Sequence, residues 1–138
     1  MINEAELITL AIQARENAYA PYSHFQVGAA LLTKKGEIYT GCNVENAAYS
    51  PCNCAERTAV FKAVSEGKRE FQQIAVVGGA EGKELGFCPP CGVCRQVLRE
   101  FVNEKVFQVI VAKSEKEYKK YTLEELLPQS FGPEHLSL

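Results

Sequence analysis

Two clusters of cysteine lie where predicted loops run into predicted helices, and they restrict the fold more than any other feature of the chain. The first is Cys52-Asn53-Cys54-Ala55-Glu56, and the second is Cys88-Pro89-Pro90-Cys91-Gly92-Val93-Cys94. A helix N-terminus carries free N–H groups and the positive end of the helix dipole, which stabilise thiolates, the form of cysteine that binds metal. Cys91 and Cys94 are three residues apart and share one helix face, so a fold that places the two helix starts side by side would bring Cys54 to the same ion.

The spacing of apolar residues predicts an α/β fold, in which helices cover both faces of a mixed sheet. After an opening amphipathic helix, the chain alternates between short apolar runs and segments of helical periodicity. A capping box formed by Thr122 and Glu125 predicts a short final helix. The helices are expected at residues 3–20, 54–65, 91–103 and 122–127, and the strands at 25–33, 37–42, 73–78 and 106–112.

Length and charge limit the classes of function. A chain of 138 residues predicts one domain, residues 1–138. Fifteen basic against seventeen acidic residues give a net charge of -2, which argues against a nucleic-acid partner. The apolar runs are too short to cross a membrane and the N-terminus does not resemble a signal peptide, so we expect a cytoplasmic protein. In a reducing compartment, six cysteines indicate metal ligation, catalysis or burial rather than disulfides.

Cys54, Cys91 and Cys94 are the candidate ligands of a catalytic zinc ion, because three protein ligands leave the fourth tetrahedral position open for water. Glu56 is the candidate acid/base that takes a proton from such a water and passes it to a substrate. Three thiolates around Zn²⁺ leave one negative charge in excess. Arg57, adjacent to Glu56, is the expected compensating partner of the cysteine sulfurs, and a surface salt bridge is its alternative role.

Other interpretations of the cysteines remain open on spacing alone. Cys91 and Cys94 could be a redox pair, although no thioredoxin-like pattern precedes them. A structural zinc site could recruit Cys52 or Cys88 as its fourth ligand. The run Cys88, Cys91, Cys94 also resembles an iron–sulfur motif without its usual downstream cysteine. The carboxylate of Glu56 favours catalysis.

The motifs together resemble a known family. Cys54-Ala55-Glu56, followed 37 residues after Cys54 by Pro90-Cys91-Gly92-Val93-Cys94, is similar to the signature of zinc nucleoside and nucleobase deaminases, with cysteine in place of histidine. The segments 25–30 and 43–49 resemble the short, homotetrameric type of cytidine deaminase. The similarity extends from the opening helix to Leu127-Pro128. It implies a three-layer α/β/α fold with a mixed five-stranded sheet.

The resemblance also implies a reaction, which is hydrolytic deamination of cytidine and 2'-deoxycytidine to uridine and 2'-deoxyuridine in pyrimidine salvage. One Zn²⁺ per chain would be held by Cys54, Cys91 and Cys94, and Glu56 would protonate N3 and then the departing amino group. A deaminase of a nucleoside analogue such as blasticidin S, or a structural zinc protein without catalysis, is the alternative.

The resemblance assigns substrate contacts as well. Phe25 would flank the pyrimidine, Asn43 and Glu45 would hydrogen-bond the ribose 3'-hydroxyl, and the backbone of Ala55 and of Cys91 would hold the base edge. Asn43 and Glu45 are two residues apart on an extended segment, so their side chains should point to the same side. In the homotetramer, active sites are shared, and a neighbouring chain would contribute Ala47, Tyr49 and Phe131.

Overall fold

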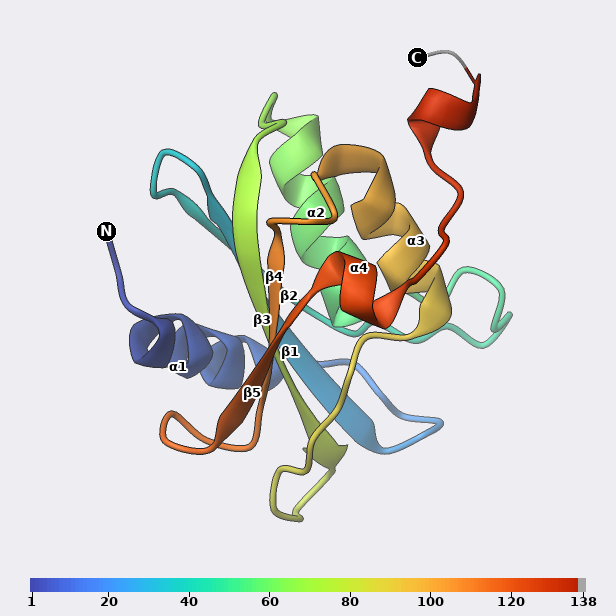
Figure 1. Cartoon of the computed structure of the whole chain (residues 1–138). Coiled ribbons are helices and arrows are strands. Elements are labelled where there is room, and N and C mark those ends of the chain that lie inside the picture. Colours follow the sequence, from blue (N-terminus) through green and yellow to red (C-terminus); the bar gives the residue numbers. More distant parts are fainter. Residues whose placement is uncertain (137–138) are drawn as a thin grey trace.

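The computed structural model describes residues 1–136, and its centre is a mixed five-stranded sheet (Figure 1). The strand order is β2-β1-β3-β4-β5, in which β3 and β4 are parallel and the other neighbours are antiparallel. The first two strands form an antiparallel hairpin, with Gly36 in the left-handed conformation at φ 95° in the turn. The strands are β1 (Phe25–Thr33), β2 (Ile38–Cys42), β3 (Phe71–Ala80), β4 (Gln108–Ala112) and β5 (Tyr118–Thr122).

Helices cover both faces of this sheet, which confirms the predicted three-layer architecture (Figure 1). On one face, α1 (Glu4–Arg15) buries Leu7, Ile8 and Ala11 against alternate residues of β1, β3 and β4. On the other face lie α2 (Ala55–Ser65), α3 (Gly92–Phe101) and the short α4 (Leu123–Leu126). The alternation of side chains along each strand supplies one apolar set to each layer. A single turn of 3₁₀ helix, Pro133–Leu136, ends the described chain.

The structure differs most from the sequence prediction at the end of the first helix and at one additional strand. The first helix ends at Arg15 instead of residue 20, because the chain beyond it pairs with the segment after β2: the Tyr19 N–H donates to the Asn43 carbonyl, and the Glu45 N–H donates to the Tyr19 carbonyl. The edge strand β5 was not predicted from periodicity. Its exposed lysines interrupt the apolar pattern, as charged residues commonly do on edge strands.

The sheet holds the starts of α2 and α3 at one place. Gly41 in β2 lets the backbone of α2 approach closely, since a Cβ there would lie 2.6 Å from the Ala55 carbonyl oxygen and 2.6 Å from the Ala59 nitrogen. The helix α3 belongs to the crossover between the parallel strands β3 and β4, so it lies on the same face as α2. The N-cap residues of the two helices are Cys54 and Cys91. No helix within residues 1–136 is long and apolar enough to span a membrane.

Candidate metal centre and active site

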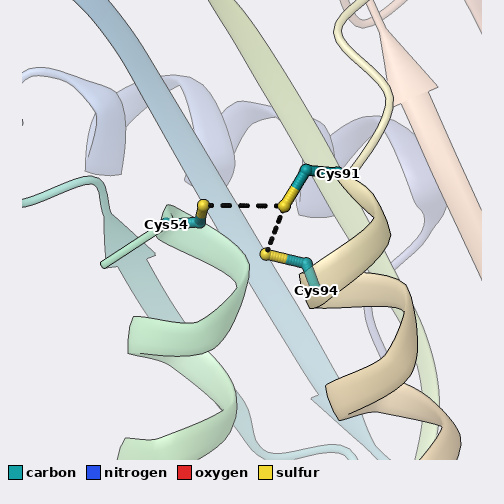
Figure 2. Close-up of side chains that lie close together, drawn as sticks. All are labelled: Cys54, Cys91 and Cys94. Carbon is teal, nitrogen blue, oxygen red and sulfur yellow. Dashed lines mark hydrogen bonds between the residues drawn. The ribbon is translucent and has the colours of Figure 1, made fainter. Parts of the chain in front are cut away.

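Three cysteine sulfurs converge between the starts of α2 and α3 (Figure 2). The Sγ atoms of Cys54 and Cys91 are 3.9 Å apart, and those of Cys91 and Cys94 are 3.6 Å apart. All three sulfurs lie within 4.8 Å of one another. Two sulfurs bound to one tetrahedral zinc ion at about 2.3 Å are separated by about 3.8 Å. The three residues therefore have both the chemistry and the spacing that a zinc ion requires.

Arg57 lies against this cluster. Its Nη2 donates to the Cys54 sulfur at 3.2 Å. The pKa of Cys54 is lowered to about 5, first by the hydrogen bond from Cys94 and then by Arg57, while donating that bond raises the pKa of the Cys94 thiol. The Arg57 Nε is buried and has no hydrogen-bond partner among residues 1–136. The guanidinium thus places its positive charge beside a thiolate, where it can offset the excess negative charge of a three-thiolate site.

Glu56 is a buried carboxyl group in the first turn of α2, with a relative exposure of 4%. Burial raises its pKa to about 7, and the neighbouring Cys54 thiolate contributes in the same direction. A group with a pKa near 7 accepts and releases a proton readily at neutral pH. The burial of Glu56 and its raised pKa therefore fit the acid/base role that the sequence predicts for it.

A pocket of about 240 Å³ opens directly over the cysteine cluster. It brings together two of the three candidate metal ligands, Cys54 and Cys91, with the buried carboxyl group and the two polar residues after β2, all of which the sequence indicates as site residues. The free thiols of Cys52 and Cys88 also face it, and burial raises the pKa of Cys88 to about 11. The lining is Val27, Asn43, Glu45, Cys52, Asn53, Cys54, Glu56, Arg57, Cys88, Pro89 and Cys91.

Asn43 and Glu45 face the same pocket, and both are held in place by other parts of the chain. The Asn43 side chain accepts from the Val27 N–H at 2.9 Å and donates to the Phe25 carbonyl at 2.8 Å. Glu45 accepts from the backbone N–H groups of Tyr22 and Ser23 and from the Ser23 hydroxyl. The Ser23 hydroxyl is the main cause that lowers the pKa of Glu45. Each polar group is therefore oriented before any ligand arrives.

Phe25 and Ala55 lie at the borders of this pocket. Phe25 begins β1, is 40% exposed and lines an adjoining hollow of about 490 Å³, which shares Cys88 and Pro89 with the first pocket. Ala55 is the buried first residue of α2, directly after Cys54. Neither residue belongs to the lining of the first pocket itself.

Ala47, Tyr49 and Phe131 are outside the described lining of the pocket in their own chain. Ala47 and Tyr49 belong to an exposed loop, in which Tyr49 has a left-handed backbone with φ 62° and makes an edge contact with Tyr22. Phe131 is 55% exposed, and its ring stacks on His135 with centroids 4.9 Å apart. If these residues act at an active site, it belongs to another copy of the chain.

Sequence reasoning missed three residues of the lining, Val27, Asn53 and Pro89. Val27 is an apolar strand residue whose alternation with its neighbours gives no sign of a ligand. Asn53 stands between two cysteines of the first cluster and donates from its side chain to the Thr58 hydroxyl on α2. A polar residue just before a helix N-cap was the signal that could have identified it.

An α/β/α fold with three convergent cysteines at two helix starts, and a buried carboxyl group beside them, defines a class of zinc-binding enzymes with a small pocket. Comparison with known proteins agrees: the family model of the cytidine and deoxycytidylate deaminase zinc-binding region matches residues 1–110. The chain belongs to this family.

Individual relatives agree with this assignment. The chain is 51% identical to a cytidine deaminase of Sporosarcina psychrophila over 96% of its own length and 93% of that protein. The crystal structure of a cytidine deaminase from Burkholderia pseudomallei superposes with a TM-score of 0.85 at 46% identity, covering 94% of this chain and 100% of that one. A blasticidin-S deaminase of Bacillus cereus is 29% identical, over 93% of this chain and 91% of that protein.

Proposed function

We propose that this protein is a zinc-dependent cytidine deaminase, which hydrolyses cytidine and 2'-deoxycytidine to the corresponding uridines and ammonia in pyrimidine salvage. The observation that carries the proposal is the meeting of Glu56 with Cys54 and Cys91 in the lining of one nucleoside-scale pocket. The named relatives support the choice of substrate. A redox pair would not account for the third sulfur, since Cys54 Sγ lies 3.9 Å from Cys91 Sγ.

The zinc ion would be held by Cys54, Cys91 and Cys94, one ion per chain, with Arg57 beside the Cys54 sulfur. When bound, zinc supplies Lewis acidity, which lowers the pKa of water at the open coordination position. The three thiolates weaken this effect by their negative charge, and the guanidinium of Arg57 offsets that loss.

Glu56 moves the protons of the reaction. In the proposed sequence its carboxylate accepts a proton from the attacking water and delivers it to N3 of the pyrimidine. It then accepts the remaining proton from the hydroxyl group added at C4 and transfers it to the exocyclic nitrogen, so that the C4–N bond breaks, the C4=O bond forms and ammonia leaves. A pKa near 7 serves both directions of transfer, because the group is neither strongly acidic nor strongly basic at neutral pH. Its burial keeps competing bulk water away from the carboxyl group.

Asn43 and Glu45 would bind the ribose 3'-hydroxyl. An ionised carboxylate offers about four acceptor positions and an amide offers two donors and two acceptors. The contacts to Ser23, Tyr22, Val27 and the Phe25 backbone leave each side chain a remaining position for the sugar. Phe25 would flank the pyrimidine ring, while the backbone of Ala55 and of Cys91 would hold the base edge.

The exposed positions of Ala47, Tyr49 and Phe131 support a homotetramer with shared active sites. In this arrangement each chain, a single domain over residues 1–138, supplies the metal centre, and its neighbours complete the walls of the pocket. We place the enzyme in the cytoplasm, where reduced thiols favour metal binding. A net charge of -2 does not favour binding to nucleic acid.

Loss of the cytidine absorbance band tests the proposal, with purified wild-type protein compared against Glu56→Gln. The substitution removes the proton carrier and keeps the shape, so we expect kcat to fall by about 10²- to 10⁴-fold, with one zinc per chain retained by elemental analysis. Glu66→Gln, at the other end of α2, is the matched control and should keep its activity.

Other outcomes separate the competing functions. Equal turnover by Glu56→Gln and the wild type would contradict the acid/base role. Turnover of blasticidin S but not of cytidine would identify a deaminase of nucleoside analogues. Tight zinc binding without turnover of either compound would identify a structural zinc protein.

A further inference from the structure

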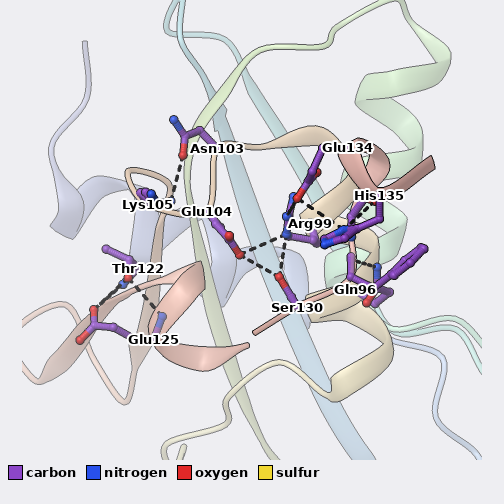
Figure 3. Close-up of polar contacts among 12 residues, drawn as sticks. Gln96, Arg99, Asn103, Glu104, Lys105, Thr122, Glu125, Ser130, Glu134 and His135 are labelled. Carbon is purple, nitrogen blue, oxygen red and sulfur yellow. Dashed lines mark hydrogen bonds and ion pairs between the residues drawn. The ribbon is translucent and has the colours of Figure 1, made fainter. Parts of the chain in front are cut away.

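Arg99 forms a buried polar network that ties the C-terminal segment to α3 (Figure 3). Its Nε lies 2.7 Å from the Ser130 hydroxyl and 3.1 Å from a carboxylate oxygen of Glu104. Its Nη2 is paired with Glu134, and the Ser130 hydroxyl donates to Glu104 at 2.8 Å. Arg99 is only 7% exposed, so a charged side chain has been withdrawn from water to hold three groups at once.

The same network holds the backbone on both sides of Phe131. The Gln96 amide, on α3, donates to the Phe131 carbonyl at 2.9 Å. Gly132 lies directly against the guanidinium, and a Cβ at this position would be 2.6 Å from the Arg99 Nη2. The segment 130–132 is therefore pressed onto α3 through its backbone and its serine.

The side chain of Phe131 receives no comparable burial. It is 55% exposed, and within residues 1–136 its one ring-stacking partner is His135, which belongs to the turn Pro133–Leu136. Figure 1 shows that this part of the chain extends away from the sheet, beyond α3. A large apolar side chain is thus held outward by a buried charge network, an arrangement that prepares it for contact with something other than its own core.

We propose that Arg99 is a positioning residue, which fixes Phe131 so that its ring closes the pyrimidine pocket of a second copy of the chain. The inference rests on the proposed function and deepens it. It identifies a side chain that does not touch the substrate but fixes the position of the pocket wall that a second copy supplies. Arg99 holds Ser130 and Glu134, Gly132 allows the close approach, and Phe131 makes the contact across the interface.

The geometry of the guanidinium explains why arginine stands at this position. The group must reach a hydroxyl and two carboxylates in different directions, which needs the fork of arginine. Lysine keeps the charge but is a point donor, so Arg99→Lys should loosen the segment. Gly132→Ala should displace the segment by collision while it leaves every charge in place.

A first experiment measures the order of residue 131 directly. The chain contains no tryptophan, so Phe131→Trp introduces a single tryptophan, which can be excited selectively over the tyrosines. We expect restricted rotation, seen as high fluorescence anisotropy, in the oligomer. The anisotropy should fall when Arg99→Lys or Gly132→Ala is added, with the oligomer mass by light scattering unchanged. Unchanged anisotropy in both double variants would overturn the proposal.

A second experiment separates positioning from general stability. Base–aromatic stacking contributes about 1–3 kcal/mol, so weakened placement of Phe131 should raise KM for cytidine at least about fivefold. Zinc content should stay at one per chain. Lys120→Ala breaks the Glu4–Lys120 ion pair at the edge strand and serves as the control with unchanged KM. If Arg99→Lys and Gly132→Ala both keep the KM of the wild type, the proposal is wrong.

A mixed oligomer shows whether Arg99 acts on another copy. Co-expression of a Glu56→Gln chain with an Arg99→Lys chain creates sites in which Glu56 comes from one chain and an intact Arg99 and Phe131 come from the other. A component with the KM of the wild type should reappear in the mixture. Its absence would mean that Arg99 acts only within its own chain and would overturn the proposal. A wild-type protein that does not deaminate cytidine would instead refute the proposed function, and the anisotropy test would still decide whether Arg99 orders the segment.

Discussion

Replacement of Gly41 by alanine should disturb the metal centre from the far side of α2. The new Cβ would lie 2.6 Å from the Ala55 carbonyl oxygen and the Ala59 nitrogen, and 2.9 Å from the Thr58 Cβ. Two of these atoms are helix backbone, which cannot rotate aside as a flexible side chain would. Ordinary contact begins at 3.4 Å, so the start of α2 must retreat by about 0.8 Å.

This displacement is large for a metal site. Cys54 directly precedes Ala55, so its sulfur should move by a similar amount relative to Cys91 and Cys94. Metal–ligand distances tolerate only about 0.2 Å. We therefore expect the zinc affinity to fall at least about tenfold, in the range found for disturbed supports of metal ligands. Overpacking should also cost about 1–3 kcal/mol of unfolding free energy, or about 3–10 °C in Tm for a chain of this length.

Competition for zinc with a chromophoric chelator measures the affinity, and thermal unfolding measures the stability. Gly92→Ala is the matched control, because Gly92 directly follows the ligand Cys91 and a Cβ there meets nothing within 4 Å among the described residues. The control should bind zinc as the wild type does. Gly41→Ala with the zinc affinity and Tm of the control would refute the reasoning that the clearance at Gly41 sets the position of Cys54.

Two further predictions concern groups that tune the site. Arg57→Gln removes the charge beside the Cys54 sulfur, so zinc affinity at neutral pH should fall about 10- to 100-fold in the same chelator assay; equal affinity of Arg57→Gln and of the surface control Arg69→Gln would contradict this. Ser23→Ala removes the main contact that lowers the pKa of Glu45, and the ionised carboxylate is a stronger acceptor for a sugar hydroxyl than the protonated group. The rise of KM on acidification should therefore begin at a higher pH in Ser23→Ala than in the wild type, and superimposable profiles would exclude the role of Glu45 in binding.

Local sequence patterns predicted most of the secondary structure, and the failures have local causes. The apolar spacing continues through Ala18, but the helix ends at Arg15 because Tyr19 pairs with the segment around Val44. Four of the five residues of β5 are lysine or tyrosine, and pairing with the neighbouring β4 makes them a strand. In both places a partner distant in sequence decides the backbone conformation, and a single window of residues contains no information about that partner.

The candidate site also has features that the sequence predicted and features that it could not predict. The metal ligands and the proton carrier could be predicted from the spacing of Cys54, Glu56, Cys91 and Cys94. Such groups need particular residue types at short, regular intervals. The sequence could not predict the distances between the two cysteine clusters. Nor could it predict the close approach of α2 to Gly41, which sets those distances. Asn43 and Glu45 were identified by resemblance, but their orientation depends on Ser23 and on the backbone of β1.

The sequence by itself determined the chemistry of this protein: three thiols, one carboxyl group and one guanidinium at helix starts, in a chain with too little charge excess for a polyanion. Chemistry of this kind is carried by residue types and by spacing within one turn of a helix. Only the tertiary structure decided which side chains meet. It brought residues 37 positions apart to 3.9 Å, and it placed Phe131 outside its own pocket on a segment held by Arg99. Such contacts depend on how the layers pack around the sheet, which is a property of the whole chain and of no single segment.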